Sequence, residues 1–305
     1  MIILFPRDPL NTKQPDENFV AEESAAKLVG FKTFLFDHDE FVRTGEFKCN
    51  LPKNNGQFET VILRGWMLQA GQYYELYCKL EEEYGYHLIN NPDEYINCHY
   101  FPNAYQHICD YTSKSWWSGE WNGREEANTP EAISWGPVRD LLDRSDLIIK
   151  DYVKSEKDNP ELFILNKELT NEEFGKRIGK FIEARGKLFN YGIVLKKVEP
   201  LKKYGEQTNE YRIYFLNNTI FTWGYNVNDI NVKAPMMSMD IVNSLISVGK
   251  NIKSNFFTID VAEKEDGSWM ILETGDGQVS GLPNGQETIK FYNTLNNTLT
   301  GVEQN

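Results

Sequence analysis

Residues 1–90 alternate between short apolar runs and amphipathic stretches, which is the pattern of an α/β unit. Runs rich in β-branched and aromatic residues predict strands at residues 2–5, 33–36, 60–63 and 86–90. Helix-period patterns predict helices at residues 19–29 and 71–84. We therefore expect an α/β domain over residues 1–112, in which ligands would bind near the carboxyl ends of the strands.

The pattern is lost over residues 113–144, where no helix or strand period holds for long. Glycine, serine and asparagine surround four tryptophans, namely Trp116, Trp117, Trp121 and Trp135. We interpret this stretch as a connecting segment. It could be a lid or substrate loop, or a loop that packs its aromatic rings on the body of the protein.

Regular patterns return over residues 145–305, which we expect to form a second domain of mixed α and β structure. A strand over residues 145–155 is followed by a helix to Arg185, begun by Thr170 or Asn171 and ended by Gly186. Further elements are predicted at residues 192–201 (a strand broken by proline), 210–215 and 219–223 (a hairpin), 235–249 (a helix) and 286–299 (a helix).

The stretch with the strongest chemical signal is a second hairpin over residues 256–273. If Asp266-Gly267 is a two-residue turn, counting outward places Asp260 directly opposite Glu273. Opposed carboxylates repel and are costly to desolvate, so a divalent cation is the natural partner. The glycine-spaced loop at residues 274–283 adds Asp276 as a third possible oxygen ligand. An acidic pair on an exposed sheet face is the alternative interpretation.

Several basic residues are placed where an anion could bind. Strand alternation puts Lys150, Tyr152 and Lys154 on one face, and two aligned ammonium groups favour a phosphate chain between them. Solvated lysines on an edge strand are the alternative. Arg64 follows a predicted strand and could bind an anionic ligand or form a structural salt bridge. Arg212 should lie on the strand face opposite Ile213 and Phe215.

Composition narrows the functional class. The formal net charge of the 305-residue chain is −13, which argues against binding long nucleic acid, although a local basic cleft is compatible with it. No apolar run approaches the ~18 residues of a membrane span, and residues 1–5 are too short for a signal peptide. The cysteines have no CxxC spacing, and together with the nearby histidines they fit no standard zinc pattern. We expect reduced thiols and a cytoplasmic protein. No feature specifies an oligomeric state.

The order of these features over residues 60–285 resembles the ATP-grasp superfamily. The shared order is a strand with Lys150, a hinge at Val198-Glu199, a strand with Arg212, and paired strands with Asp260 and Glu273. Three segments most resemble a bacterial and phage clade of ATP-grasp domain proteins: Arg64-Gly65-Trp66-Met67, Lys150-Asp151-Tyr152-Val153-Lys154-Ser155 and Gly275-Asp276-Gly277-Gln278-Val279-Ser280-Gly281-Leu282-Pro283.

The resemblance implies an α+β fold of the ATP-grasp type, in which two α+β subdomains clasp ATP, preceded by an α/β domain like the pre-ATP-grasp domain. It implies that Arg212 contacts the transferring phosphoryl group and that Asp260 and Glu273 bind Mg²⁺. The family usually has asparagine two residues after this glutamate, and here that position is Gly275. We expect Asp276 to replace the missing ligand, which leaves the number of magnesium ions open. Expected nucleotide contacts are Lys150, Lys154, Lys196, Val198, Glu199 and Arg64, with Lys150 also catalytic.

The reaction implied by the resemblance is phosphoryl transfer from ATP to a carboxylate, followed by capture of the acyl phosphate by an amine. Positioning and charge neutralisation would supply most of the acceleration. The acceptor would be a small molecule or a peptide. The alternatives are an ATP-dependent ligase acting on a nucleic-acid or protein end, and a nucleotide-binding module without turnover.

Overall fold

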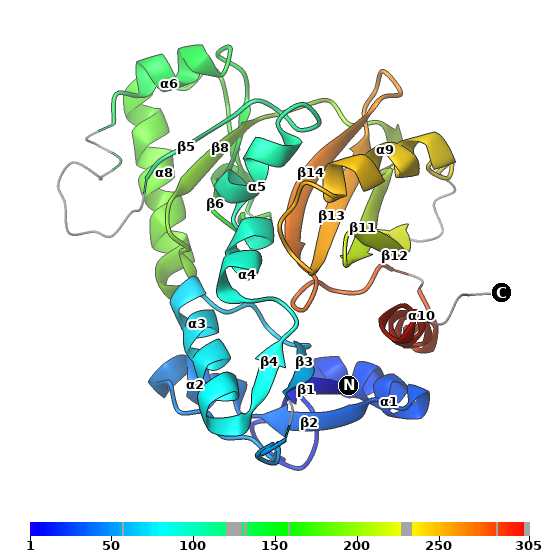
Figure 1. Ribbon diagram of the computed structural model, residues 1–305. Coiled ribbons are helices and arrows are strands. Elements are labelled where there is room, and N and C mark those ends of the chain that lie inside the picture. The colour runs from blue at the N-terminus through cyan, green and yellow to red at the C-terminus, as the bar shows by residue number, and fades with distance from the viewer. Residues whose placement is uncertain are drawn as a thin grey trace.

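The computed structural model describes residues 1–56, 58–119, 130, 133–157, 159–226, 234–284 and 286–301. Within these residues the chain forms three four-stranded sheets and one two-stranded ribbon. Figure 1 shows one sheet at the bottom of the molecule and the other two above it, with helices α4 and α5 between the upper sheets. None of the described helices has the length and apolar character needed to cross a membrane.

The lower sheet is the expected α/β unit, with its strands parallel in the order β2-β1-β3-β4. Ile3 and Phe5 pack on one side with α1, whereas Ile2 and Leu4 pack on the other side with α3. Strand β1 is buried throughout because helices cover both faces of the sheet. The elements are β1 (Ile2–Pro6), α1 (Val20–Val29), β2 (Lys32–Phe36), α2 (His38–Thr44), β3 (Glu59–Leu63), α3 (Ala70–Lys79) and β4 (Tyr86–Leu88), with a 3-10 turn at Glu17–Phe19 and a π-helical turn at Leu80–Tyr84.

The second sheet has the order β5-β8-β6-β7 and is antiparallel. Its edge strand β5 (Ser115–Trp117) and the helix α6 (Trp135–Leu141) both come from the segment that we expected to be a connection. That segment is therefore part of the domain, because Trp135 packs on Phe174 of α8. Trp121 lies outside the described residues. The other elements are β6 (Leu147–Asp151), α7 (Pro160–Phe163), β7 (Ile164–Leu165), α8 (Asn171–Arg185), a 3-10 turn at Gly186–Leu188 and β8 (Ile193–Lys197).

The third sheet is antiparallel with the order β12-β11-β13-β14. Asn217 and Asn218 both have positive φ, 49° and 62°, as a two-residue hairpin turn requires. Ile213, Phe215 and their neighbours on one face pack on helix α9, so the opposite face is left for polar residues. The elements are β11 (Glu210–Leu216), β12 (Thr219–Tyr225), α9 (Met239–Gly249), β13 (Phe256–Glu263) and β14 (Trp269–Asp276), preceded by the ribbon of β9 (Lys203–Tyr204) and β10 (Gln207–Thr208).

Three helices join the sheets. Helices α4 (Pro92–His99) and α5 (Phe101–Ile108) run from the lower sheet to the edge of β14. The last helix, α10 (Thr288–Thr300), returns to the lower sheet and lies beside α1 (Figure 1). Phe291 and Tyr292 of α10 share one core cluster with Phe5 of β1 and Tyr214 of β11. The first and last parts of the chain are therefore packed around a common core.

Arg64 connects the lower sheet to the loop that follows β14. Its side chain is buried, and Nε and Nη2 each donate to a carboxylate oxygen of Glu22 at 2.9 Å. Its Nη1 donates at 2.9–3.0 Å to the carbonyl oxygens of Gly277, Gln278 and Ser280. The expected anionic ligand of Arg64 is thus replaced by Glu22, and we no longer assign Arg64 to the nucleotide site.

Replacing Arg64 by methionine should destabilise the protein by about 3–5 kcal/mol, because Glu22 would become an unpaired buried charge. The midpoint of urea denaturation measures this loss. Arg43→Met is the matched control, since Arg43 pairs with Glu40 on the surface and an exposed pair contributes about 1 kcal/mol or less. Equal losses in the two variants would contradict the structural role of Arg64.

Candidate nucleotide and ligase site

The hairpin of β13 and β14 pairs Asp260 with Glu273, as predicted, although the turn differs from the prediction. The Lys264 amide donates to the Ser268 carbonyl, so the turn has three residues and Gly267 adopts a φ of +82°. This shifts the register by one residue. A bulge between Asp260 and Val261 then restores it, because Leu272 has no partner on β13. The carboxylate pair therefore depends on two irregularities that offset each other.

The bulge also organises the free edge of β14. The carbonyl oxygen of Leu272 accepts a hydrogen bond from Nζ of Lys196 in the second sheet. Next to it, the amide of Ile271 donates to Tyr111, and its carbonyl accepts from Thr112 at 2.7 Å. The edge strand is thus covered, and the second and third sheets are connected along it.

Two lysines from the second sheet lie over this edge. Lys150 is on β6 and Lys196 is on the neighbouring strand β8, and both are 5% exposed. Nζ of Lys150 lies 3.2 Å from Oε2 of Glu273, and both ammonium groups lie over the ring of Phe101, at 5.7 and 4.5 Å from its centroid. Burial and the charge of Lys150 lower the pKa of Lys196 to about 7. Lys196 is therefore a poorly solvated cation that an anion would stabilise.

Lys154 reaches the site by a different route from the one predicted. Strand β6 ends at Asp151, whose carboxylate accepts the amides of Val153 and Lys154 and fixes a turn. Lys154 therefore lies in a loop and does not continue the face of Lys150. Burial would raise the pKa of Glu273, but the charges of Lys150, Lys154, Lys157 and Arg212 lower it well below its usual range.

Arg212 is paired with Asp260 on the neighbouring strand. Its Nε donates to Oδ1 at 2.8 Å and its Nη2 to Oδ2 at 2.6 Å, while Nη1 donates to the Gly281 carbonyl at 3.0 Å. Asn226 donates to the same Asp260 Oδ2 at 3.0 Å. The predicted face of Arg212 is observed, because Ile213 and Phe215 are in the core on the other side.

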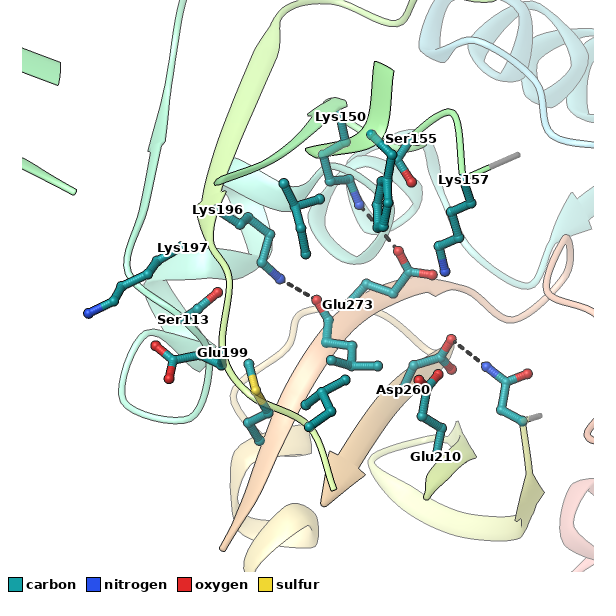
Figure 2. Close-up of a pocket in the computed structure, with 16 residues that line it drawn as sticks. Ser113, Lys150, Ser155, Lys157, Lys196, Lys197, Glu199, Glu210, Asp260 and Glu273 are labelled. Carbon is teal, nitrogen blue, oxygen red and sulfur yellow. Dashed lines mark hydrogen bonds and ion pairs between the residues drawn. The ribbon is translucent and has the colours of Figure 1, made fainter. Parts of the chain in front are cut away.

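Glu210 is a site residue that we did not predict. It lies two residues before Arg212 on β11, so strand alternation places it on the same face. Figure 2 shows its side chain beside Asp260. Burial raises the pKa of Glu210, with smaller contributions from Asp260 and Glu273. Alternation applied to Arg212 would have identified it.

Asp276 is not a third ligand of this group. Strand β14 continues to Asp276, so its side chain points to the face opposite that of Glu273, an odd number of residues away. It is fully buried and accepts hydrogen bonds from Asn90 Nδ2 at 2.6 Å and from the Gln278 amide at 2.8 Å. Burial raises its pKa to about 7. Asp276 belongs to the junction with the lower sheet.

Gly275 does lie on the face of Glu273, as the family pattern requires. A Cβ atom at this position would come within 3.2 Å of both Ser280 Oγ and Thr258 Oγ1. Those two hydroxyls are hydrogen-bonded to each other at 2.9 Å. The space of the usual asparagine is thus partly taken by a pair of hydroxyl groups.

Two cavities meet at the carboxylate pair. The larger, of about 160 Å³, lies between the second and third sheets, and Lys150, Lys196 and Glu199 line it (Figure 2). The smaller, of about 50 Å³, is lined by Lys154, Arg212, Ser280 and other residues of the loop after β14. Asp260 and Glu273 line both cavities. The amide of Val198 donates to the Asp146 carbonyl, and Val198 is not among the lining residues.

The donor set fits magnesium bound together with phosphates. No group of three or more Asp, Glu, His or Cys side chains suited to a metal ion occurs among the described residues. Asp260 and Glu273 therefore offer two carboxylates and no complete cage. Mg²⁺ commonly binds to one or two carboxylates, with substrate phosphates and water completing its coordination.

Comparison with known families identifies the fold to which this arrangement belongs. The model of an ATP-grasp domain family, the third family of its clade, matches residues 137–295, slightly more than half of the chain. The chain belongs to this ATP-grasp family. The expected superfamily, fold class and ligase-like enzyme class are therefore confirmed at the level of the family. The chain has no significant match among curated proteins.

Solved ATP-grasp enzymes share the fold over nearly the whole chain. The ATP-grasp ligase PsnB, solved with a minimal precursor, is 14% identical with a TM-score of 0.56, and 99% of each chain is covered. D-cycloserine synthetase DcsG is 14% identical with a TM-score of 0.57, covering 98% of this chain and 100% of its own. D-alanine-D-alanine ligase from Coxiella burnetii is 13% identical with a TM-score of 0.61, covering 97% and 92%. At these identities the likeness concerns the fold.

Binding of Mg·ATP at pH 8 should take up protons from solution. Lys196, with a pKa of about 7, is mostly neutral at that pH, and phosphates beside it would raise its pKa. The bound protein would then hold more protons than the free protein, and the uptake should vanish near pH 5, where Lys196 is already charged. Calorimetry in two buffers of different ionisation enthalpy measures the uptake.

Lys196→Met should abolish this uptake. Lys197→Met is the matched control, because Lys197 pairs with Asp143 and points away from the carboxylates (Figure 2). Undiminished uptake in the Lys196 variant would show that another group is responsible.

Proposed function

We propose that the protein is an ATP- and Mg²⁺-dependent ligase that converts a carboxylate to an acyl phosphate for capture by an amine. The observation that carries this proposal is the position of Asp260 and Glu273 between two cavities. One cavity offers buried lysines to a phosphate chain, and the other offers Lys154 and Arg212 to an anionic acceptor. A phosphoryl group held at the carboxylate pair would lie between its donor and its acceptor.

The larger cavity is the proposed nucleotide site. Lys150 and Lys196 would contact the phosphates, and Glu199, with the adjacent backbone at Val198, would contact the base and ribose. Asp260 and Glu273 would hold Mg²⁺, which would neutralise charge on the phosphates. Lys154 lies where the phosphate chain would leave this cavity for the smaller one.

The charged groups are in place without nucleotide. Arg212 pairs with Asp260, and Lys150 pairs with Glu273. Both carboxylates therefore remain ionised, and all four side chains are held by partners of opposite sign. Nucleotide binding would exchange partners within this set and would not have to order flexible side chains, which lowers the entropic cost of binding.

The proposed reaction needs no nucleophile from the protein. A carboxylate oxygen of the acceptor attacks the γ-phosphorus, the bond to the β–γ bridging oxygen breaks, and ADP leaves with the electron pair. The amine then attacks the acyl carbon, phosphate leaves with the electron pair of the C–O bond, and the amine loses a proton to water. Arg212, which donates to Asp260 and to the loop after β14, is placed to contact the transferring group in a bidentate manner.

The acceptor is a small molecule or a peptide. PsnB, which shares the fold, was solved with its minimal precursor. A net charge of −13 disfavours a nucleic-acid end as the acceptor. The four free cysteines suit a reducing compartment, so we retain the cytoplasm as the proposed location. The second candidate function is nucleotide binding without turnover, which the loss of one family ligand at Gly275 favours.

The products distinguish these possibilities. With an acceptor whose carboxylate carries ¹⁸O, we expect ADP and phosphate, with one labelled oxygen in the released phosphate, because the carboxylate oxygen is retained by phosphorus. Mass spectrometry of the phosphate measures the label. AMP and pyrophosphate would instead indicate an adenylating ligase, and tight ATP binding without any product would indicate the module.

Asp260→Asn should raise the Mg²⁺ concentration required for turnover on the order of tenfold, because the variant keeps the shape but loses a ligand charge. Asp276→Asn should leave the Mg²⁺ requirement unchanged and should destabilise the fold by about 1–3 kcal/mol, because its new amide would face the donors of Asn90 and Gln278. Magnesium titration of ADP release and urea denaturation measure the two effects. A similar magnesium shift in both variants would return Asp276 to the metal site.

A further inference from the structure

The smaller cavity contains a histidine to which the reaction above assigns no role. His99, at the end of α4, lines the cavity with Lys154, Arg212 and Ser280. It is 5% exposed, and its ring packs on Tyr95 at a centroid distance of 4.8 Å. Its Nδ1 lies 3.4 Å from the amide nitrogen of Asp276. Its Nε2 is shielded from solvent and has no hydrogen-bond partner within the described part of the chain.

These contacts determine the tautomer of His99. A backbone amide can only donate, so Nδ1 is the acceptor and the ring proton of the neutral imidazole is on Nε2. Burial lowers the pKa of His99 to about 3, and the charges of Lys154 and Lys150 act in the same direction. The ring therefore presents an N–H donor, and a buried donor without an acceptor is unfavourable unless a ligand supplies one.

The rest of the cavity suits an anionic oxygen. Lys154 and Arg212 provide positive charge, and Ser280 and Thr258 provide hydroxyl groups. Val153 and Val279 close the remaining wall with apolar surface. A volume of about 50 Å³ is less than the share of two water molecules in the liquid, about 60 Å³. This is enough for a carboxylate group and the carbon behind it.

We propose that Nε2–H of His99 donates a hydrogen bond to the carboxylate of the acceptor substrate and orients that carboxylate toward the site of phosphoryl transfer. The proposal rests on the proposed function and specifies the acceptor as an organic acid with little bulk next to its carboxylate. His99 acts as a neutral donor and not as a general base, because its lone pair at Nδ1 is directed at the Asp276 amide.

The direct test uses acetate as the probe, since acetate fits the volume of the cavity. The chain has four histidines, so the imidazole nitrogens can be assigned by NMR in the full-length protein. Before any ligand is added, His99 should show the Nε2–H tautomer. With Mg·ADP present, acetate should shift the Nε2 resonance of His99 and leave that of His107 unchanged. The Nδ1–H tautomer, or no shift of His99 across the titration, would overturn the proposal.

A kinetic test uses hydroxylamine, which captures an acyl phosphate as a hydroxamate. A panel of small carboxylic acids with Mg·ATP and the wild-type protein identifies an acceptor. His99→Leu should then raise KM for that acid by about tenfold or more, since a hydrogen bond to a charged group is lost, and leave KM for ATP unchanged. His99→Gln, which keeps an amide donor near the position of Nε2, should recover most of the loss. His107→Leu is the matched control on the neighbouring helix.

The outcomes separate this inference from the proposed function. Hydroxamate formation by wild type with an unchanged KM for the acid in His99→Leu would refute the role of His99 and retain the ligase. Equal loss in His99→Leu and His99→Gln would also refute it, because the donor would then not matter. No hydroxamate with any acid would tell against the ligase, and the acetate titration would still decide whether His99 binds a carboxylate.

Discussion

The opposition of Asp260 and Glu273 is the constraint on which the arrangement of the upper two sheets depends. Two carboxylates directly across a strand pair repel each other, and burial makes that repulsion stronger. The repulsion is offset by one cation for each carboxylate, and the two cations come from different places. Arg212 is on the neighbouring strand of the same sheet, whereas Lys150 belongs to the second sheet. The third sheet can therefore hold its carboxylate pair only when the second sheet lies against it.

The same reasoning explains why β14 can be an edge strand without being exposed. An open edge offers unpaired backbone groups to other chains. Here the extra residue Leu272 turns a carbonyl toward Lys196, and Ile271 pairs with the segment before β5. Backbone groups that a regular strand would leave to solvent thus connect the two sheets, with a buried lysine as one partner. The cost of burying Lys196 is visible in its lowered pKa, and an anionic ligand would relieve it.

Local patterns in the sequence were sufficient for the elements, the family and the face of each strand. The pairing of Asp260 with Glu273 was predicted correctly from an incorrect turn, because the added turn residue and the bulge at Leu272 offset each other. The failures have one physical origin, which is contact between distant segments. Glu22 satisfies Arg64, Asn90 satisfies Asp276, and α10 packs on the first strand. No periodicity encodes such partners. The nucleotide and metal roles of the remaining residues stay predictions.

The departure from the family at Gly275 has a structural consequence beyond the loss of one oxygen ligand. Gly275 lies on the face of the carboxylate pair, at the wall of the smaller cavity. A side chain there would start within 3.2 Å of the hydroxyl groups of Thr258 and Ser280 and would fill the space in front of them. With glycine, these hydroxyls and the loop held by Arg64 remain next to the carboxylates. The chain thus exchanges a possible second-metal ligand for room at the acceptor side. Because the loop is fixed to the buried Arg64–Glu22 pair, that room is part of the folded structure and does not depend on the arrival of a substrate.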